Sequence, residues 1–373
     1  MGDPRVTLGA ERRDLEAARR PKLSGQGYMA RTTLSALAAL ASALFVVACS
    51  MPAADAQGIS VSGNTFVRDG RPWVPQGFSL VAIVAPPGHE FNGQFANASG
   101  LYGPRLLAQA QSLGANTLRF QVSQAGLDPQ SPIYSPSYVQ EIVDKVRQAR
   151  AAGFVAIVSM QWEKPAGLPG QPGMPGDSTL RAWSSIGSAF ANDGDVMLEL
   201  FNEPDMWERN PQAWPTWQQG MQAVVDELRS AGARNVLILD GIHGSHVLAG
   251  APAINDPLHR LAYAVHPYFM GSGDGPADWE SEWGQFADSH PVLVSEWNAL
   301  SSNKRCSPDW AETSQQFLQE LGRRRIGVLI WALDLPSTVV DDSGAPLTFQ
   351  NFGCGVRGAG AASMAIQYMK SVR

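Results

Sequence analysis

Two glutamates in this chain directly follow apolar runs that have the character of buried strands. Residues 196–204 read VMLELFNEP, so that a mostly apolar run leads into Asn202, Glu203 and Pro204. Residues 291–298 read PVLVSEWN and place Glu296 after a second apolar run. Because proline has no backbone N–H, strand pairing must end at Pro204. We therefore expect both glutamates at the ends of buried strands, where parallel α/β barrels carry their chemistry.

Polar and aromatic residues recur at the ends of the predicted strands. They are Arg119, Gln161, Trp162, Asn202, His266, Tyr268, Trp297 and Trp331. Two facing carboxyl groups fit the hydrolysis of a glycosidic bond, because one can protonate the leaving oxygen while the other stabilises an oxocarbenium-like centre. Arg119, Tyr268 and His266 are expected to keep one carboxylate ionised, which leaves its partner with a raised pKa.

Strand-like and helix-like segments alternate through the chain and would position these residues. The predicted strands are 74–79, 116–122, 154–160, 196–201, 236–240, 262–266, 292–295 and 327–331, and helical periodicity is clearest at 104–113, 137–152, 179–191, 211–231, 310–321 and 361–371. Eight such strands predict a (β/α)8 barrel. An open doubly wound sheet is the alternative, but its Gly-rich phosphate loop is missing. A hairpin around Asp69 and Gly70 is expected to close the barrel floor.

The ordered set of these motifs resembles glycoside hydrolase family five, the cellulase-like enzymes of the retaining clan A. The matching segments are GANTLR at 114–119, LELFNEP at 198–204, HPY at 266–268, VSEW at 294–297, and Trp331. The resemblance implies that Glu203 is the acid/base and Glu296 the nucleophile. It also implies that Arg119 and Tyr268 bond the nucleophile, that Asn202 holds the sugar 2-hydroxyl, and that Trp331 stacks beneath the sugar.

Two departures from the family pattern lie close to the cleaved sugar. Gln161 stands where the family usually has a histidine, and Ser295 and Asn298 stand where it usually has glycines. The leading substrate is β-1,4-glucan, and β-mannan, xylan-type chains and exo-acting β-glucosidase activity are the alternatives within the class. A carbohydrate-binding barrel without turnover is the alternative outside it. The remaining histidines lack metal-ligand spacing, so neither a metal nor a cofactor is expected.

The N-terminal residues have the pattern of an export signal. An almost uncharged apolar run over 32–48 follows Arg31 and precedes an Ala54-Asp55-Ala56 cleavage site. We expect residues 1–56 to be an upstream extension and signal, with a start at Met29 and cleavage after Ala56. A lipobox ending at Cys49 is the alternative. Residues 57–373 would then form the secreted or periplasmic enzyme domain.

The remaining composition agrees with export and with a neutral substrate. Cys306 and Cys354 are an even pair, for which an oxidising compartment predicts a disulfide. The formal net charge is −6, and the chain has no basic run. This argues against nucleic acid or an anionic membrane as a partner. The protein is expected to be a monomer that binds carbohydrate.

Overall fold

The computed structural model describes residues 58–91, 95–163, 168, 173–268, 275–298, 310–335 and 361–372. These residues all belong to one compact unit, Ala54–Arg373. The predicted signal and the three cysteines lie outside the described residues. Export, the lipobox alternative and the disulfide between Cys306 and Cys354 therefore stay predictions.

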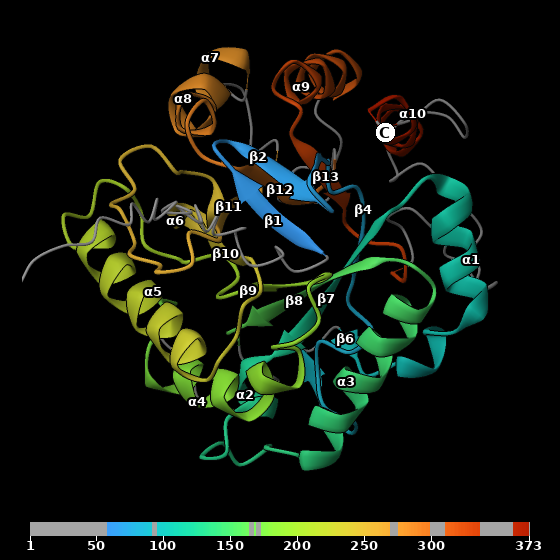
Figure 1. Ribbon diagram of the computed structural model, residues 1–373, viewed down its shortest axis with the longest axis vertical. Coiled ribbons are helices and arrows are strands. Elements are labelled where there is room, and N and C mark those ends of the chain that lie inside the picture. Colours follow the sequence, from blue (N-terminus) through green and yellow to red (C-terminus); the bar gives the residue numbers. More distant parts are fainter. Residues whose placement is uncertain are drawn as a thin grey trace, which may run out of the picture. The chain divides into compact units, whose positions relative to one another are not determined.

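Eight parallel strands close into a barrel, as the sequence predicts, with helices around its outside (Figure 1). The closed order is β10-β11-β12-β13-β4-β7-β8-β9, so the last strand pairs with the first. The strands are β4 Gly77–Leu80, β7 Thr117–Ser123, β8 Val155–Gln161, β9 Val196–Glu199, β10 Leu237–Asp240, β11 Leu261–Val265, β12 Val292–Trp297 and β13 Gly327–Ile330. The carboxyl ends of all eight strands consequently meet at one end of the barrel.

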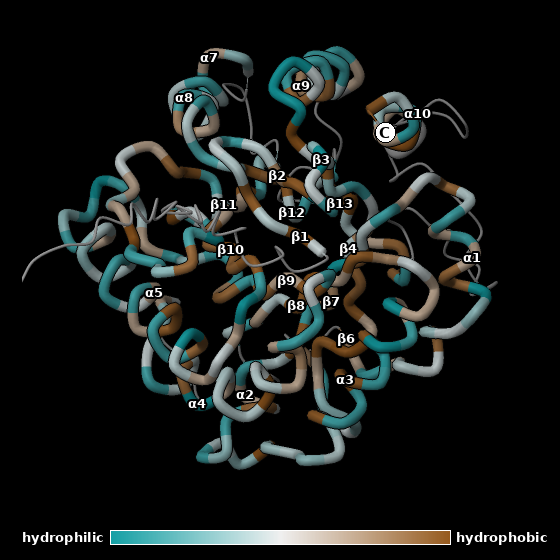
Figure 2. Tube along the Cα trace, viewed as in Figure 1, coloured by the Kyte–Doolittle hydropathy of each residue, from teal (hydrophilic) through white to brown (hydrophobic). Residues whose placement is uncertain are grey.

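Six helices lie close to their predicted positions. They are α1 Pro104–Leu113, α3 Pro136–Ala151, α4 Asp177–Ile186, α5 Ala213–Ser230, α9 Trp310–Arg324 and α10 Ala361–Ser371. Figure 2 shows hydrophobic residues concentrated along the central strands and hydrophilic residues on the outer helical turns. Among the described residues, none of the helices has the length and apolar character needed to cross a membrane.

Several short elements were not predicted. They are α2 Gln124–Leu127, α6 Ile242–Ser245, the consecutive turns α7 Pro276–Trp279, η3 Glu280–Gly284 and α8 Gln285–Ala287, the 3₁₀ turns η1 Ser99–Leu101 and η2 Gly187–Ala189, and the strand pair β5 Glu90–Phe91 and β6 Phe95–Ala96. Each is too short to show a helical or strand period in the sequence, which explains why pattern reasoning missed it.

The N-terminal strands form an antiparallel sheet of β1 Ile59–Ser62, β2 Thr65–Arg68 and β3 Arg71–Pro72. Asp69 and Gly70 join β2 to β3 with φ of 51° and 76°. Two positive φ values in succession are typical of the tight turn that the Asp-Gly pair predicts. The expected hairpin is therefore confirmed, and β1 adds one more strand to it.

This sheet packs against the amino-terminal end of the barrel interior. Ile59 and Phe66 are buried in one cluster with inward residues of the barrel strands, among them Ile157, Ile238 and Leu293. The barrel floor is thus filled with apolar side chains, as expected for a closed (β/α)8 core. Substrate access must be at the opposite end, where the strand-end residues gather.

Candidate active site

Arg119 on β7 lies at the centre of the polar end of the barrel and is fully buried. Its Nε donates to Glu199 Oε2 at 2.5 Å, its Nη1 donates to Glu296 Oε2 at 2.8 Å, and its Nη2 donates to Asn202 Oδ1 at 2.7 Å. Burial works against the charge, but Glu199 and Glu296 outweigh it and raise the pKa of Arg119 above its ordinary value. A permanent cation on β7 therefore joins the ends of β9 and β12.

A bulge in β12 turns Glu296 into the barrel. Between the pairs Val294–Val328 and Trp297–Ile330, β12 uses one residue more than β13 does. A bulge of this kind breaks the strict alternation of side chains between the two faces of a strand. Ser295 and Glu296 consequently both point inward, where each makes hydrogen bonds to barrel residues.

Three donors hold the Glu296 carboxylate. Arg119 Nη1 and Gln121 Nε2 donate to Oε2 at 2.8 and 2.7 Å, and the Tyr268 hydroxyl donates to Oε1 at 2.7 Å. Burial raises the pKa of Glu296 and the Glu203 charge adds to this, while Arg119 and the Tyr268 hydrogen bond oppose the rise. Gln121 was not singled out from the sequence, although it lies two residues after Arg119 and so on the same face of β7.

Glu203 follows β9 at a backbone corner with φ of 49°. This left-handed conformation costs about 1–2 kcal/mol for a residue with a Cβ. Two hydrogen bonds hold the corner: the Glu203 N–H donates to Asp240 Oδ2 at 3.1 Å, and Trp162 Nε1 donates to the Glu203 carbonyl at 3.3 Å. Each offsets about 0.5–1.5 kcal/mol of that cost. The corner directs Asn202 and Glu203, which are consecutive residues, into one site.

The Glu203 side chain lies against a neutral histidine. Its Oε1 is 2.8 Å from His266 Nδ1. Burial raises the pKa of Glu203 to about 7, and burial lowers the pKa of His266 to about 4. We expected His266 to support the same carboxylate as Arg119 and Tyr268. That expectation was wrong, because His266 bonds the opposite glutamate of the pair.

The two strand-end glutamates face one another across the site. One carboxylate oxygen of each, together with a ring nitrogen of His266, lie within 4.8 Å of one another. The sequence separation of the glutamates gives no hint of this closeness, which the barrel alone produces by bringing the ends of β9 and β12 together.

A third carboxyl group, Glu163, was missed by the sequence analysis. It follows β8, and its Oε1 accepts a hydrogen bond from Asn202 Nδ2 at 3.2 Å. Because Arg119 donates to the other end of the Asn202 amide, the orientation of that amide is fixed. Burial raises the pKa of Glu163 to about 8, and the Glu203 charge adds to the rise. Glu163 sits in a loop of unpredicted shape, so no strand pattern pointed to it.

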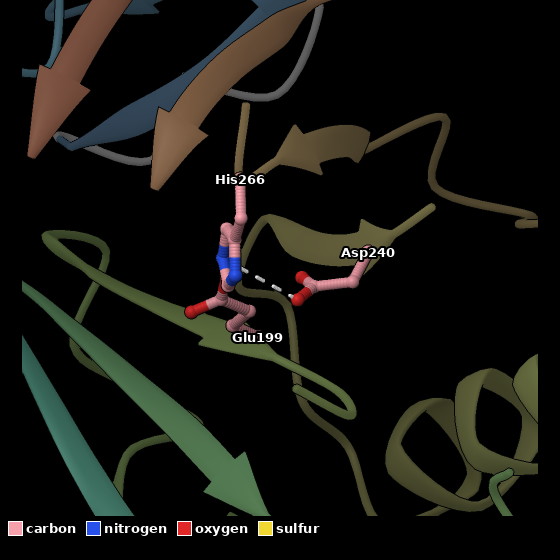
Figure 3. A group of neighbouring side chains, drawn as sticks. All are labelled: Glu199, Asp240 and His266. Carbon is pink, nitrogen blue, oxygen red and sulfur yellow. Dashed lines mark ion pairs between the residues drawn. The ribbon is translucent and has the colours of Figure 1, made fainter. Parts of the chain in front are cut away.

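Glu199, Asp240 and His266 lie together in the barrel (Figure 3), with one potential metal-ligand atom of each within 4.8 Å of the others. Most of their ligand atoms already have protein partners: Glu199 accepts from Arg119 and from a serine hydroxyl, both His266 nitrogens are engaged, and Asp240 Oδ2 accepts from a backbone N–H, which leaves only Asp240 Oδ1 without a hydrogen bond among the described residues. Arg119 adds a positive charge beside the group. These residues therefore do not fit a metal ion. Glu199 is fully buried and paired with Arg119, as is typical of a structural carboxylate.

The remaining predicted site residues of this end of the barrel are two half-buried tryptophans and a buried glutamine. Trp162 is half-buried and stacks on Phe201, with the ring centroids 6.0 Å apart and an angle of 5° between the ring planes. Trp331 is also half-buried and meets the edge of Phe95 at 6.2 Å. Gln161 is buried inside the barrel, where its Nε2 donates to Ser159 at 3.4 Å.

Trp297, which was predicted from its strand-end position to belong to the site, lies outside it. Its side chain is 0% exposed and packs against Phe317 of α9, with ring centroids 5.1 Å apart. The physical reason is the bulge in β12, after which Trp297 points outward toward the helix layer rather than into the site. Trp297 is therefore a packing residue of the outer core.

Comparison with known proteins agrees with this barrel. The family model "Cellulase (glycosyl hydrolase family 5)" matches residues 86–335, so the protein is a glycoside hydrolase. The chain belongs to glycosyl hydrolase family 5, as its motifs indicated.

The individual relatives share little sequence identity with this chain. The chain is 26% identical over 208 residues to the manganese dependent endoglucanase Eg5A of Phanerodontia chrysosporium, which covers 52% of this chain and 48% of the relative. It thus spans about half the length of that curated relative.

Solved structures share the fold at low identity. The β-glucanase SdGluc5_26A of Saccharophagus degradans in complex with cellotetraose has a TM-score of 0.62 at 18% identity, over 84% of this chain and 94% of that one. A β-mannanase from Streptomyces thermolilacinus has a TM-score of 0.56 at 19% identity, over 82% and 97% of the two chains.

Proposed function

We propose that this protein is a secreted, retaining β-glycosidase that hydrolyses a neutral polysaccharide by double displacement. The observation that carries the mechanism is the closeness of the Glu203 and Glu296 oxygens, within 4.8 Å. Retaining enzymes hold their two carboxyl groups about 5–5.5 Å apart, whereas inverting enzymes leave about 6.5–9.5 Å for a water molecule. The separation of at most 4.8 Å between the Glu203 and Glu296 oxygens fits the retaining spacing better than the inverting one.

Glu296 is the nucleophile in this proposal. Donors from Arg119, Gln121 and Tyr268 all stabilise its ionised form and fix its orientation. The carboxylate attacks the anomeric carbon, the bond to the leaving oxygen breaks, and a glycosyl ester forms on Glu296.

Glu203 is the acid/base. Its raised pKa of about 7 keeps a proton available in neutral solution. That proton passes to the leaving oxygen in the first step. In the second step the Glu203 carboxylate removes a proton from water as the water attacks the anomeric carbon, and Glu296 is released.

Asn202 and Trp331 are proposed to bind the sugar at the point of cleavage. The resemblance to the family assigns the 2-hydroxyl to Asn202, and its amide is held at both ends by Arg119 and Glu163. The same resemblance places Trp331 beneath the sugar ring, and the half-buried indole leaves an apolar surface for stacking.

The leading substrate is β-1,4-glucan. One curated relative is an endoglucanase, and one similar structure contains cellotetraose. The formal net charge of −6 suits a neutral polymer better than an acidic one. β-Mannan is the second candidate, because a β-mannanase shares the fold. We do not expect the manganese dependence of that relative in this protein, because Glu199, Asp240 and His266 already bond protein groups.

A substrate panel tests the proposal. Soluble glucan, soluble mannan and a set of aryl β-glycosides are incubated with the parent protein and with Glu296→Gln as the matched inactive control. We expect turnover by the parent, highest on glucan, and almost none by the variant. Binding of oligosaccharide without turnover of any substrate would instead support the non-catalytic barrel.

A further inference from the structure

Ser295 links His266 to Glu199 in the buried floor of the site. Its Oγ donates to Glu199 Oε1 at 2.6 Å, and the same Oγ lies 2.9 Å from His266 Nε2. Ser295, Glu199 and His266 are all 0% exposed, so water does not compete for these contacts. Ser295 belongs to the bulge of β12, one residue before Glu296, and it departs from the usual pattern of the family.

The hydrogen bonds around Ser295 allow only one arrangement of the protons on Ser295 and His266. A serine hydroxyl has a single proton. Arg119 lowers the pKa of Glu199 to about 2 against the effect of burial, so Glu199 is ionised and can only accept. The Ser295 proton is therefore used on Glu199, and its oxygen must accept from His266. It follows that His266 Nε2 carries the proton and that Nδ1, on the neutral ring, is bare.

We propose that Ser295 is a positioning residue that fixes this tautomer of His266, so that the bare Nδ1 accepts a hydrogen bond from the acid/base Glu203. The inference rests on the proposed function of Glu203. A bare nitrogen 2.8 Å from Glu203 Oε1 stabilises the protonated carboxyl, which is the form that a general acid needs. When a glycoside binds, its leaving oxygen competes with Nδ1 for that proton.

The opposite tautomer would have the opposite effect. With its proton on Nδ1, His266 would donate to an ionised Glu203 and favour loss of the acid proton. The charged and titratable groups that act on His266 in the described part of the chain come from several elements. They are Glu199 and Glu203 around β9, Asp240 on β10, Glu296 on β12, Arg119 on β7, and His246 after α6. The nearest of these to Nε2, Asp240 and Glu199, are 3.6 and 4.0 Å away, too far to replace the serine.

The first test is the pH dependence of kcat/KM, which reports ionisations of the free enzyme. Ser295→Ala should move the basic limb to lower pH by about one unit, because the tautomer that stabilises ionised Glu203 becomes accessible. Ser295→Thr keeps a hydroxyl and should leave the limb near that of the parent.

Ser79→Ala is the matched control. Ser79 is another fully buried barrel serine, and its hydroxyl donates to the Ser295 carbonyl at 3.2 Å without touching His266. The basic limb of the Ser79→Ala pH profile should coincide with that of the parent, even if kcat/KM itself changes. A Ser295→Ala limb that coincides with those of the parent and Ser79→Ala overturns the proposal.

The second test reads the tautomer directly in the parent protein and does not depend on activity. Only the assignment of the signals uses a variant, which must be folded. The ¹⁵N NMR signals of the parent's histidine rings are recorded near neutral pH, and the His266 pair is assigned by its loss in His266→Asn. We expect a proton on Nε2 and none on Nδ1. A protonated Nδ1 overturns the tautomer assignment, even if the protein proves to be an active glycosidase. Failure of the substrate panel with the expected NMR result would instead reject only the catalytic role.

Discussion

At the residue scale, Glu203 combines the needs of an acid catalyst with a cost in stability. Its side chain is half-buried, its backbone is in the left-handed region, and its pKa is raised to about 7 from an ordinary value of 4.5. A folded protein that holds a proton more tightly than the unfolded chain loses stability as the pH rises between those two values. Ionised Glu203 should therefore destabilise the native state above neutral pH.

This gives a prediction for Glu203→Gln, which is neutral at all pH values. The variant should gain little stability over the parent at pH 4.5. At pH 8 it should gain on the order of 2 kcal/mol, because each unit of pKa shift corresponds to about 1.4 kcal/mol and neighbouring charges are coupled to Glu203. Thermal unfolding at both pH values measures the difference.

Glu90→Gln, which replaces an exposed carboxyl, is the matched control for that measurement. Its effect on the melting temperature should be small at both pH values. An equal gain for Glu203→Gln at pH 4.5 and pH 8 would show that Glu203 does not carry the predicted ionisation.

Strand-end position was enough to find the two central residues from the sequence. Glu203 and Glu296 each end an apolar run, and Arg119 is a charge within one. Asp240 also ends an apolar strand, and its carboxylate accepts a hydrogen bond from the Glu203 backbone N–H. No sequence pattern predicts a hydrogen bond of this kind. Glu163 lies past the strand end in a loop, where periodicity carries no information.

At the element scale, two backbone irregularities make the site. The left-handed corner at Glu203 and the bulge in β12 each turn two consecutive side chains inward, whereas a regular strand would alternate them. Neither feature was predictable, because the bulge depends on pairing with β13 and the corner depends on bonds from Asp240 and Trp162. The eight strands themselves were predictable from their apolar runs.

Trp297 tests the consequence of the bulge. Trp297→Ala should lower the free energy of unfolding by about 3–5 kcal/mol, as for other fully buried aromatic residues. KM should remain close to that of the parent under conditions where the variant is folded, since the indole contacts Phe317 rather than the site. Urea unfolding and steady-state kinetics provide the two measurements.

Trp207→Ala is the control, because Trp207 is 46% exposed and its loss should cost much less stability. A Trp297→Ala protein with unchanged stability and a strongly raised KM would contradict the outward orientation and restore the expected contact with substrate.

At the scale of the whole molecule, the fold separates stability from chemistry. The β1–β3 sheet and the apolar interior close one end of the barrel, and Arg119, Glu203 and Glu296 lie together toward the other. The sequence predicted this division because alternating strands and helices define the barrel and its carboxyl ends. It did not define the substrate, since sugar contacts on a barrel come from loops that vary independently of the core.

The account depends most on Glu296 being the residue that becomes glycosylated. A 2-deoxy-2-fluoro glycoside with a good leaving group, of the sugar preferred in the substrate panel, should inactivate a retaining enzyme by slowing hydrolysis of the glycosyl ester. Peptide mapping by mass spectrometry then locates the label. The account predicts one sugar per protein, attached to Glu296, and no label in Glu296→Gln. A label on Glu203, or an unlabelled protein that still turns over its substrate, would contradict it.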